Sequence, residues 1–313
     1  MEAIRIHKFG GPDVLEVDDV EKPVAGSGEL LVQVMAASVS PVDYKIRGGG
    51  YDDAGQALPI TLGRDLAGVV EEVGLDVDGF AIDNDVFALL GRDRGAYAQY
   101  VIVTPDEVAR MPPSLSYVEA AAVPLAGLTA WQGLFDHGDL QSGQRVLIHG
   151  GAGGVGHLAV QFAKARGAFV ATTASSEDIA FLSEIGADQV IDYQRQRFEE
   201  ESSDFDLVYD LIGGETQDRS WGVLKRGGAL ITTLKEPSRE EAQRRQLRAA
   251  HYMTVPNSTE LAEIAGLIQS GRVKVRVQSV YPLSEAGQAQ SALERGHVQG
   301  KIVLKSEQPA GTI

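Results

Sequence analysis

The sequence predicts an α/β protein in which a doubly wound parallel sheet is joined to a separate β-rich domain. Three observations favour this fold class. Short strands broken by glycine, proline and aspartate fill roughly the first hundred residues, helices and strands alternate from Tyr117 onward, and a glycine-rich turn separates a strand from a helix within residues 146–164. Alternation implies parallel strands with helices on both faces, whereas closely spaced short strands are typical of an all-β unit.

The β-rich part is expected at both ends of the chain. In the N-terminal part the predicted strands cover residues 3–7, 30–37, 68–73, 85–89 and 96–103. Near the C-terminus, residues 274–281 and 301–305 are predicted strands around a short helix at 284–295. We therefore expect this tail to return to the first domain.

The middle of the chain carries strands at the spacing of a parallel sheet. They are predicted over residues 146–149, 169–173, 189–191, 206–210, 229–233 and 251–255. Because 313 residues exceed the usual size of one hydrophobic core, two domains are expected. We place one in residues 1–116 and 280–313, and the other in residues 117–279.

The glycine-rich turn has the spacing of a dinucleotide-binding fingerprint. It consists of Gly151, Ala152, Gly153, Gly154, Val155 and Gly156. In G-x-G-x-x-G, the first glycine permits a tight turn, the second lets the backbone approach a pyrophosphate, and the third lets the helix pack close to the strand. The diphosphate would lie at the helix N-terminus, where N–H groups and the helix dipole favour an anion. The sequence therefore predicts a Rossmann βα unit.

Composition excludes several classes of partner and chemistry. The net charge of -16 argues against a nucleic acid or an anionic membrane surface as a partner, because no run of basic residues offsets it. The absence of cysteine excludes disulfides, thiol nucleophiles and cysteine-bound metals. No secretory signal and no membrane span is evident, so the expected location is the cytoplasm.

Seven motifs in order resemble the medium-chain dehydrogenase/reductase superfamily, and within it the zinc-independent quinone oxidoreductase branch, the zeta-crystallin-like proteins. They are SPVDYKIRGGGY from Ser40, GRDLAGVV from Gly63, GAYAQYV from Gly95, AAVPLAGLTAW from Ala121, GQRVLIHGGAGGVGHLAVQFAK from Gly143, DLIGG from Asp210 and GHVQGKIVL from Gly296. The resemblance implies a GroES-like β-rich domain, completed by the C-terminal tail, beside the Rossmann domain. It also implies a homodimer.

The resemblance also bears on metal binding. Zinc-dependent relatives carry a cysteine ligand, a Gly-His-Glu motif and a four-cysteine lobe, whereas this chain has no cysteine and reads Gly63-Arg64-Asp65 at the Gly-His-Glu position. An arginine is permanently protonated and cannot replace an imidazole ligand. We therefore expect no catalytic metal.

Residues near the end of the second Rossmann strand predict the cofactor. An NAD-specific fold places an acidic residue there for the ribose 2′-hydroxyl, but this chain has Ala174 and Ser175, which leaves room for NADP(H). By resemblance, Ser175 and Tyr193 match the NADP pattern, while Glu177 stands in place of the expected basic residue. The alternative is that Ser175 begins a plain helix N-cap.

Further cofactor contacts come from the resemblance alone. Thr129, in the Pro-x-x-x-x-Thr motif from Pro124, matches the residue beside the nicotinamide, although a plain helix-interior threonine is the alternative. Lys301, in GHVQGKIVL, is a further implied cofactor contact. His149 and His157 flank the glycine turn, and packing is the common role of such histidines.

The candidate catalytic residues lie in the motifs that begin at Ser40 and Gly63. Ser40 and Asp43 occupy the ends of the family's Asn-Pro-x-Asp motif, and Tyr51 matches the tyrosine that enoyl-thioester reductases of this superfamily use as a proton donor. A phenol suits this task because it can protonate a developing enolate at neutral pH. Lys45 and Arg64 could stabilise negative charge on a reduced oxygen, or could pair with Asp43 and Asp65.

These features predict a zinc-independent, NADPH-dependent oxidoreductase that reduces quinones or α,β-unsaturated carbonyl compounds by hydride transfer. Both acceptors are conjugated electrophiles that take a hydride and leave an oxyanion, so the sequence does not separate them. Two alternatives remain open: an enoyl-thioester reductase, which Tyr51 favours, and an NADPH-binding structural or regulatory protein with little turnover.

Overall fold

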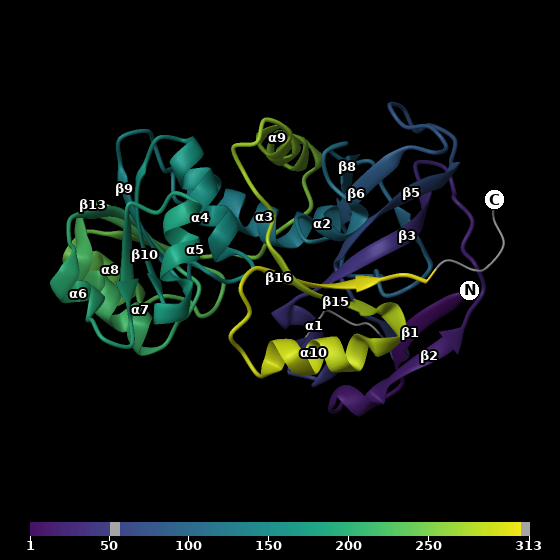
Figure 1. Cartoon of the computed structure of the whole chain (residues 1–313), viewed down its shortest axis with the longest axis horizontal. Helices are drawn as coiled ribbons and strands as arrows, with labels where there is room; N and C mark the ends of the chain where they lie inside the picture. Colours follow the sequence, from purple (N-terminus) through teal and green to yellow (C-terminus); the bar gives the residue numbers. More distant parts are fainter. Residues whose placement is uncertain (51–56, 308–313) are drawn as a thin grey trace. The chain divides into compact units, whose positions relative to one another are not determined.

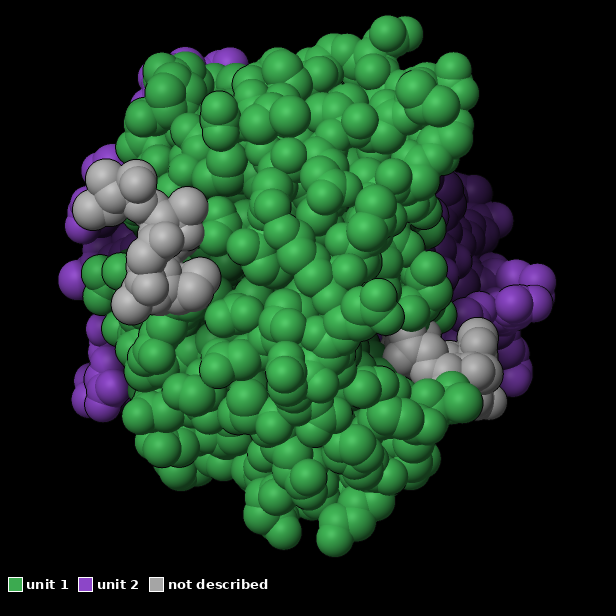
Figure 2. Space-filling view, turned by 90° about the vertical axis from the view of Figure 1, so that its right-hand side faces the viewer, with its two compact units in different colours: residues 1–125, 255–269, 275–313 green, residues 126–254, 270–274 purple. Residues whose placement is uncertain are grey.

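The structure is a computed structural model that describes residues 1–50 and 57–307, and it divides into two compact units. Unit 1 contains Met1–Leu125, Val255–Gln269 and Val275–Ile313, and unit 2 contains Ala126–Thr254 and Ser270–Lys274. Figure 2 shows the two units in separate colours. Relative to the predicted division, residues 117–125, 255–269 and 275–279 also belong to the β-rich unit.

Unit 1 is built from two sheets (Figure 1). The smaller has the order β2-β1-β4, and the larger has the order β15-β16-β3-β5-β6-β8, with β7 also pairing with β3. The strands are β1 (Glu2–Ile6), β2 (Leu15–Asp19), β3 (Leu30–Val39), β4 (Ile60–Thr61), β5 (Asp65–Val73), β6 (Asp85–Leu89), β7 (Tyr100–Val103), β8 (Val108–Arg110), β15 (Val277–Pro282) and β16 (Lys301–Lys305). Because Ile302 of β16 lies opposite Val39 of β3, the C-terminal tail belongs to the same sheet as the N-terminal strands.

The helices of unit 1 are short and lie against these sheets. They are α1 (Pro41–Arg47), α2 (Tyr117–Ala121), α9 (Ser258–Gln269) and α10 (Ala286–Glu294). Helix α2 begins at a capping box in which Ser116 and Glu119 satisfy each other's backbone N–H groups. Helix α9 packs on β8, and α10 packs on β16 and α1.

Unit 2 contains one parallel sheet of six strands in the order β11-β10-β9-β12-β13-β14. The strands are β9 (Arg145–His149), β10 (Phe169–Ala174), β11 (Gln189–Asp192), β12 (Phe205–Asp210), β13 (Leu224–Thr232) and β14 (Arg248–His251). The first strand lies in the middle and the chain winds outward to both sides, which is the dinucleotide-binding order. The predicted fold class is therefore confirmed.

The helices of unit 2 connect these strands. They are α3 (Pro124–Trp131), a π-helix (Gln132–His137), α4 (Gly156–Ala165), α5 (Ile179–Glu184), α6 (Phe198–Glu201), α7 (Glu215–Ser220) and α8 (Arg239–Arg245). Helix α4 packs on β9 and β10 (Figure 1). Its apolar Leu158 and Phe162 are buried. None of the helices in the described part of the chain is long and apolar enough to cross a membrane.

Several predicted strands differ in their bounds from those observed, among them β5 (Asp65–Val73) and β13 (Leu224–Thr232), which begin earlier than predicted. The predicted strand at 251–255 is wrong: β14 is Arg248–His251, because the parallel ladder with β13 pairs Ala229–Thr232 with Arg248–His251 despite the stronger β-propensity of the later residues. The strand predicted at 96–103 is only Tyr100–Val103, preceded by a single bridge from Ala98 to Ala3. The strand predicted at 274–281 begins later, at Val277.

Candidate functional site

The glycine-rich turn lies at the carboxyl end of β9, and its glycines are required for different reasons. A Cβ added at Gly151 would lie 2.0 Å from Thr172 Oγ1, and one added at Gly156 would lie 2.2 Å from the Gly150 carbonyl oxygen. The fold itself therefore demands both glycines. At Gly153 the nearest atom would be 3.5 Å away, an ordinary contact, so packing within the protein leaves that glycine unexplained. A ligand that approaches the backbone closely would explain it.

The turn is closed by backbone hydrogen bonds and runs into a helix N-terminus. Gly151 N–H donates to the Thr173 carbonyl at 3.2 Å, and Gly153 N–H donates to the Gly150 carbonyl at 3.2 Å. The intervening Ala152, and Gly154 and Val155 after it, lead into α4 at Gly156. The N-terminus of a buried helix favours an anion, so the predicted residues 151–156 could together hold a diphosphate.

Large exposed apolar side chains follow four of the parallel strands. Tyr193 comes directly after β11, and Ile212, Leu234 and Met253 each come two residues after the ends of β12, β13 and β14. All four are at least 40% exposed, although β12 and the second half of β13 are buried. Carboxyl ends of parallel strands share one edge of the sheet, which is where open α/β sheets bind ligands. This edge therefore presents apolar surface suited to aromatic rings.

The end of β10 carries no basic side chain. Ser175 is buried and begins a 3-10 helix, and its hydroxyl donates to Asp178 Oδ2 at 2.9 Å. Ser176 donates in the same way to Asp192 Oδ2 at 2.5 Å. Glu177 is exposed, and the Tyr193 backbone N–H donates to the Ala174 carbonyl. Ser175 thus lies at the N-cap, but its hydroxyl donates to a carboxylate and does not accept a backbone N–H.

Thr129 lies in α3, just before the π-helix, and is 6% exposed. Its hydroxyl lies 2.7 Å from the Thr254 hydroxyl, and its carbonyl accepts hydrogen bonds from both Tyr209 and Tyr252. The Tyr252 hydroxyl also receives the Gly133 N–H, a bond that acts to lower the pKa of Tyr252. Tyr252 therefore stands between a carbonyl and the N–H four residues later, which opens the helix into the π form. π-helices occur frequently at functional sites.

Unit 1 holds a buried polar cluster around the start of α1. Lys301 is 4% exposed, and its ammonium donates to the Val39 carbonyl at 3.1 Å and to Ser40 Oγ at 2.6 Å. Asp65 lies 3.7 Å from the same ammonium and accepts from the Ser38 hydroxyl. The fold therefore brings the predicted residues Ser40 and Lys301 together, with Lys301 held inside the unit.

Asp43 joins this cluster through α1. Its Oδ2 accepts from the Ser40 N–H at 2.7 Å and from the Tyr97 hydroxyl at 3.0 Å. Burial raises the pKa of Asp43 to about 6, although those two hydrogen bonds and the charge of Lys301 act to lower it. Burial likewise raises the pKa of Asp65 and lowers that of Lys301. A carboxyl of this kind can hold or release a proton close to neutral pH.

The other predicted catalytic residues have different surroundings. Lys45 is exposed in the last turn of α1. The Arg64 guanidinium is 9% exposed and donates twice to the Leu90 carbonyl, at 3.1 and 2.6 Å. Tyr51 lies outside the described residues. Tyr97 is the residue that sequence reasoning missed here, because a tyrosine in a strand-rich segment resembles any core aromatic.

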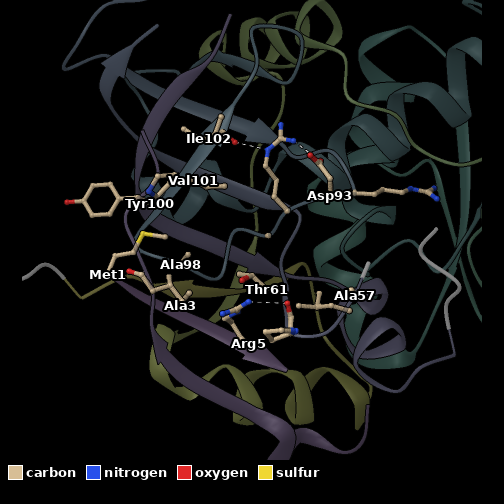
Figure 3. Close-up of a pocket in the computed structure, with 17 residues that line it drawn as sticks. Met1, Ala3, Arg5, Ala57, Thr61, Asp93, Ala98, Tyr100, Val101 and Ile102 are labelled. Carbon is tan, nitrogen blue, oxygen red and sulfur yellow. Dashed lines mark hydrogen bonds and ion pairs between the residues drawn. The ribbon is translucent and has the colours of Figure 1, made fainter. Parts of the chain in front are cut away.

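The structure also contains surface hollows in unit 1. One of them has a volume of about 820 Å³ and lies between β1, β7 and the chain at residues 92–95; Figure 3 shows Arg5 and Thr61 in its wall. It is distinct from the Asp43 cluster, since neither Asp43 nor Lys301 lines it.

Comparisons with known proteins agree with this architecture. The family model described as the alcohol dehydrogenase GroES-like domain matches residues 26–113, and the one described as zinc-binding dehydrogenase matches residues 185–304. The mitochondrial NAD(P)H oxidoreductase RTN4IP1 of Danio rerio is 32% identical, covering 97% of this chain and 91% of its own length. The chloroplastic NADPH-dependent alkenal/one oxidoreductase of Arabidopsis thaliana is 33% identical, covering 97% and 79%.

Solved structures resemble the chain over nearly its whole length. The quinone oxidoreductase from Coxiella burnetii has a TM-score of 0.91 at 38% identity and covers 97% of this chain and 99% of that one. The Escherichia coli quinone oxidoreductase complexed with NADPH has a TM-score of 0.88 at 29% identity and covers 97% and 100%.

A parallel sheet of dinucleotide-binding order with a glycine turn, in a chain that also contains a GroES-like unit, defines an oxidoreductase. The chain belongs to the medium-chain dehydrogenase/reductase superfamily, in its quinone oxidoreductase-like branch.

The zinc in one family description does not fit this chain. It has no cysteine, and Arg64 stands at the position where zinc-dependent relatives have the histidine ligand. Among the described residues, only His7, Glu16 and Asp18 could together hold a metal ion, and Arg5 already contacts Asp18 at 3.4 Å on that exposed hairpin. These residues therefore do not fit a catalytic zinc ion.

Proposed function

We propose that this chain is a zinc-independent, NADPH-dependent reductase of quinones or of α,β-unsaturated carbonyl compounds. The observation that carries the proposal is the glycine turn, where Gly153 has room that the protein does not use. Relatives named as a quinone oxidoreductase and as an alkenal/one oxidoreductase support the reaction class. When bound, the nicotinamide would supply the hydride. The protein would bind and orient the cofactor and the acceptor, and would supply the proton that completes the reduction.

NADPH is proposed over NADH on two grounds. The position at the end of β10 where a carboxylate would repel a 2′-phosphate is occupied by Ala174 and Ser175, and the acidic Glu177 and Asp178 come only in the 3-10 helix that follows. The Escherichia coli relative is described in complex with NADPH. Ser175 and Tyr193 are the proposed 2′-phosphate contacts, with Thr129 beside the nicotinamide and residues 151–156 around the diphosphate.

On the substrate side we propose that Ser40 faces the developing oxyanion. Because Lys301 is the donor in its 2.6 Å bond to Ser40 Oγ, the hydroxyl keeps its own proton for another acceptor, and the ammonium makes that proton a stronger donor. Asp43, with a pKa of about 6, is a nearby group that can take or give a proton. Tyr51 or water is the proposed final proton donor, and Arg64 and Lys45 are further candidates for stabilising negative charge.

The proposal is tested by following reduced-nicotinamide absorbance with NADPH and NADH. Each cofactor is offered with a benzoquinone, a naphthoquinone, a 2-alkenal and an enoyl thioester. Oxidation of NADPH by a quinone or by the alkenal is the expected result, with a lower kcat/KM for NADH. Turnover of the thioester alone would identify an enoyl-thioester reductase. NADPH binding without oxidation by any acceptor would identify a binding protein.

The Gly153→Ala variant tests the turn directly. The added methyl group meets only an ordinary 3.5 Å contact within the protein, so the free energy of unfolding should not change. If a diphosphate lies against this backbone, the NADPH dissociation constant should rise by about 10-fold or more, which corresponds to about 1.4 kcal/mol.

The matched control is Gly222→Ala, also in unit 2, where an added Cβ meets nothing within 4 Å. Titration of NADPH fluorescence compares the three proteins. Wild-type affinity in Gly153→Ala would show that the turn does not hold the cofactor.

The homodimer and the cytoplasmic location also remain proposals. Light scattering of the purified chain tests the first, with about twice the 33.4 kDa chain mass expected. Fractionation of the source cells tests the second, since the relatives described above include a mitochondrial and a chloroplastic protein.

A further inference from the structure

His149 is the last residue of β9, the strand at the centre of the unit 2 sheet, and it is fully buried. Its Nδ1 lies 3.1 Å from the hydroxyl of Thr173, in the neighbouring strand β10. Its Nε2 lies 2.9 Å from the hydroxyl of Ser220, in the helix α7 that follows the other neighbour, β12. One imidazole therefore bridges both flanks of the sheet directly beneath the glycine turn.

The contacts of Ser220 fix which ring nitrogen carries the proton. The Ser220 hydroxyl lies 2.6 Å from the Thr216 carbonyl, and because a carbonyl only accepts, Ser220 must donate to it. Ser220 has no second proton, so His149 Nε2–H must donate to Ser220. The neutral ring then has a bare Nδ1, which accepts.

The other end of the chain of hydrogen bonds reaches the turn. The bare Nδ1 of His149 accepts the Thr173 hydroxyl proton, which leaves the oxygen of that hydroxyl to accept the Gly150 N–H at 3.3 Å. The sequence of donors therefore runs from Gly150 N–H to Thr173, from Thr173 to His149, from His149 to Ser220, and on to Thr216.

The environment of the ring favours its neutral form. Burial is the largest influence and lowers the pKa of His149 to about 4. Among charged neighbours, Arg219 acts in the same direction, whereas Asp210 and Glu199 oppose it. A ring that stays neutral keeps one donor and one acceptor, as this chain of hydrogen bonds requires.

The conformation of Gly150 determines the positions of the other residues in the turn. Its φ of 76° is a left-handed conformation, and its carbonyl accepts the Gly153 N–H. Helix α4 begins so close to that carbonyl that only glycine fits at position 156. A fixed Gly150 therefore fixes both Gly153 and the start of α4.

We propose that His149, as the Nε2–H tautomer, is a positioning residue that holds the dinucleotide-binding turn through Thr173 and ties it to α7. The ligand in this proposal rests on the proposed function. The hydrogen-bond chain does not, because it is a property of the protein alone.

Two substitutions separate the two halves of the bridge. In His149→Asn the amide oxygen can occupy the place of Nδ1 and accept from Thr173, whereas in His149→Gln the longer amide reaches the place of Nε2 and donates to Ser220. Loss of the Thr173 bond should raise the NADPH dissociation constant by about 3- to 10-fold, the effect of one hydrogen bond. We expect this rise in the dissociation constant in His149→Gln, and a dissociation constant within about 2-fold of wild type in His149→Asn.

The kinetic readout distinguishes positioning from general damage. In His149→Gln the KM for NADPH should rise while kcat at saturating NADPH and the KM for the acceptor stay unchanged. Thr173→Val, which removes the hydroxyl, should behave like His149→Gln, and Thr173→Ser should restore affinity. Equal NADPH affinities in all four variants would overturn the role of His149 in binding. So would equal losses of affinity in His149→Asn and His149→Gln, or in Thr173→Val and Thr173→Ser.

Nitrogen NMR of histidine-labelled protein without ligand tests the hydrogen-bond chain itself. His149 should show a protonated Nε2 and a bare Nδ1, with no titration between about pH 5.5 and 8.5, a range in which an ordinary histidine titrates. A protonated Nδ1 would overturn the inference even if the chain binds NADPH. If the wild-type chain binds no dinucleotide, the proposed function fails and the binding role of His149 fails with it, while this spectrum still reports the tautomer.

Discussion

At the scale of single residues, Asp43 combines opposing influences on one carboxyl group. Its Oδ2 accepts two hydrogen bonds, but no group in the described part of the chain donates to its buried Oδ1. An unsatisfied buried oxygen favours the protonated form of the group, which agrees with a pKa raised from 3.8 to about 6. The carboxyl therefore destabilises the fold when it is ionised.

The raised pKa of Asp43 predicts that the folded protein becomes less stable as the pH rises. Because the folded protein holds this proton more tightly than the unfolded chain does, the stabilisation by protonated Asp43 is fully present below about pH 4 and is lost as the pH rises through 6. Urea unfolding of wild type and Asp43→Asn between pH 4 and 7 should show the wild type losing about 2 to 2.5 kcal/mol relative to the variant. The exposed Asp78→Asn variant is the control. A difference between wild type and Asp43→Asn that does not change with pH would contradict the assignment.

At the scale of elements, the π-helix depends on a residue far away in the sequence. Tyr252 follows β14 and inserts its hydroxyl between the Thr129 carbonyl and the Gly133 N–H. A Cβ at Gly133 would lie 2.5 Å from that hydroxyl, so the glycine is part of the same arrangement. No periodicity in the sequence around residues 124–137 predicts this helix form, because its cause lies in another element.

Removing this hydroxyl should destabilise unit 2 more than removing its neighbour. Tyr252→Phe leaves a buried N–H and weakens the bonding of a carbonyl, which should cost about 1–3 kcal/mol of the free energy of unfolding. Tyr209→Phe is the matched control: its hydroxyl lies 2.9 Å from the same carbonyl and 2.7 Å from Tyr252, whereas the Gly133 N–H bonds to Tyr252. We expect a loss of about 1 kcal/mol or less there. Equal losses by urea unfolding would argue against the insertion of Tyr252 as the cause.

Other elements show the same limit on prediction. Strand β9, the turn and helix α4 follow from local signals, since an apolar run, fingerprint spacing and an amphipathic pattern all lie within residues 146–164. The strand predicted at residues 251–255 is wrong, because the residues that pair with β13 are Arg248–His251. Tyr97 is tens of residues away from Asp43, and Ser220 is tens of residues away from His149, so only the folded chain reveals these two contacts.

At the scale of the whole molecule, the net charge of -16 should oppose the approach of an anionic dinucleotide. The end of β10 adds to this repulsion, because Glu177 and Asp178 lie there. The screening length falls from about 30 Å at 0.01 M salt to about 8 Å at 0.15 M, so added salt weakens the long-range repulsion more than short contacts within the turn.

The association rate of NADPH should therefore rise several-fold between these two salt concentrations, opposite to the usual weakening of charge-assisted binding. Stopped-flow fluorescence of the reduced nicotinamide measures this rate. Adenosine, which is uncharged, is the control ligand, and its affinity by calorimetry should not change over the same range. A rate for NADPH that falls with salt would mean that local cations and the α4 N-terminus dominate the approach. In that case the field of the whole molecule would not govern how the cofactor reaches the sheet edge.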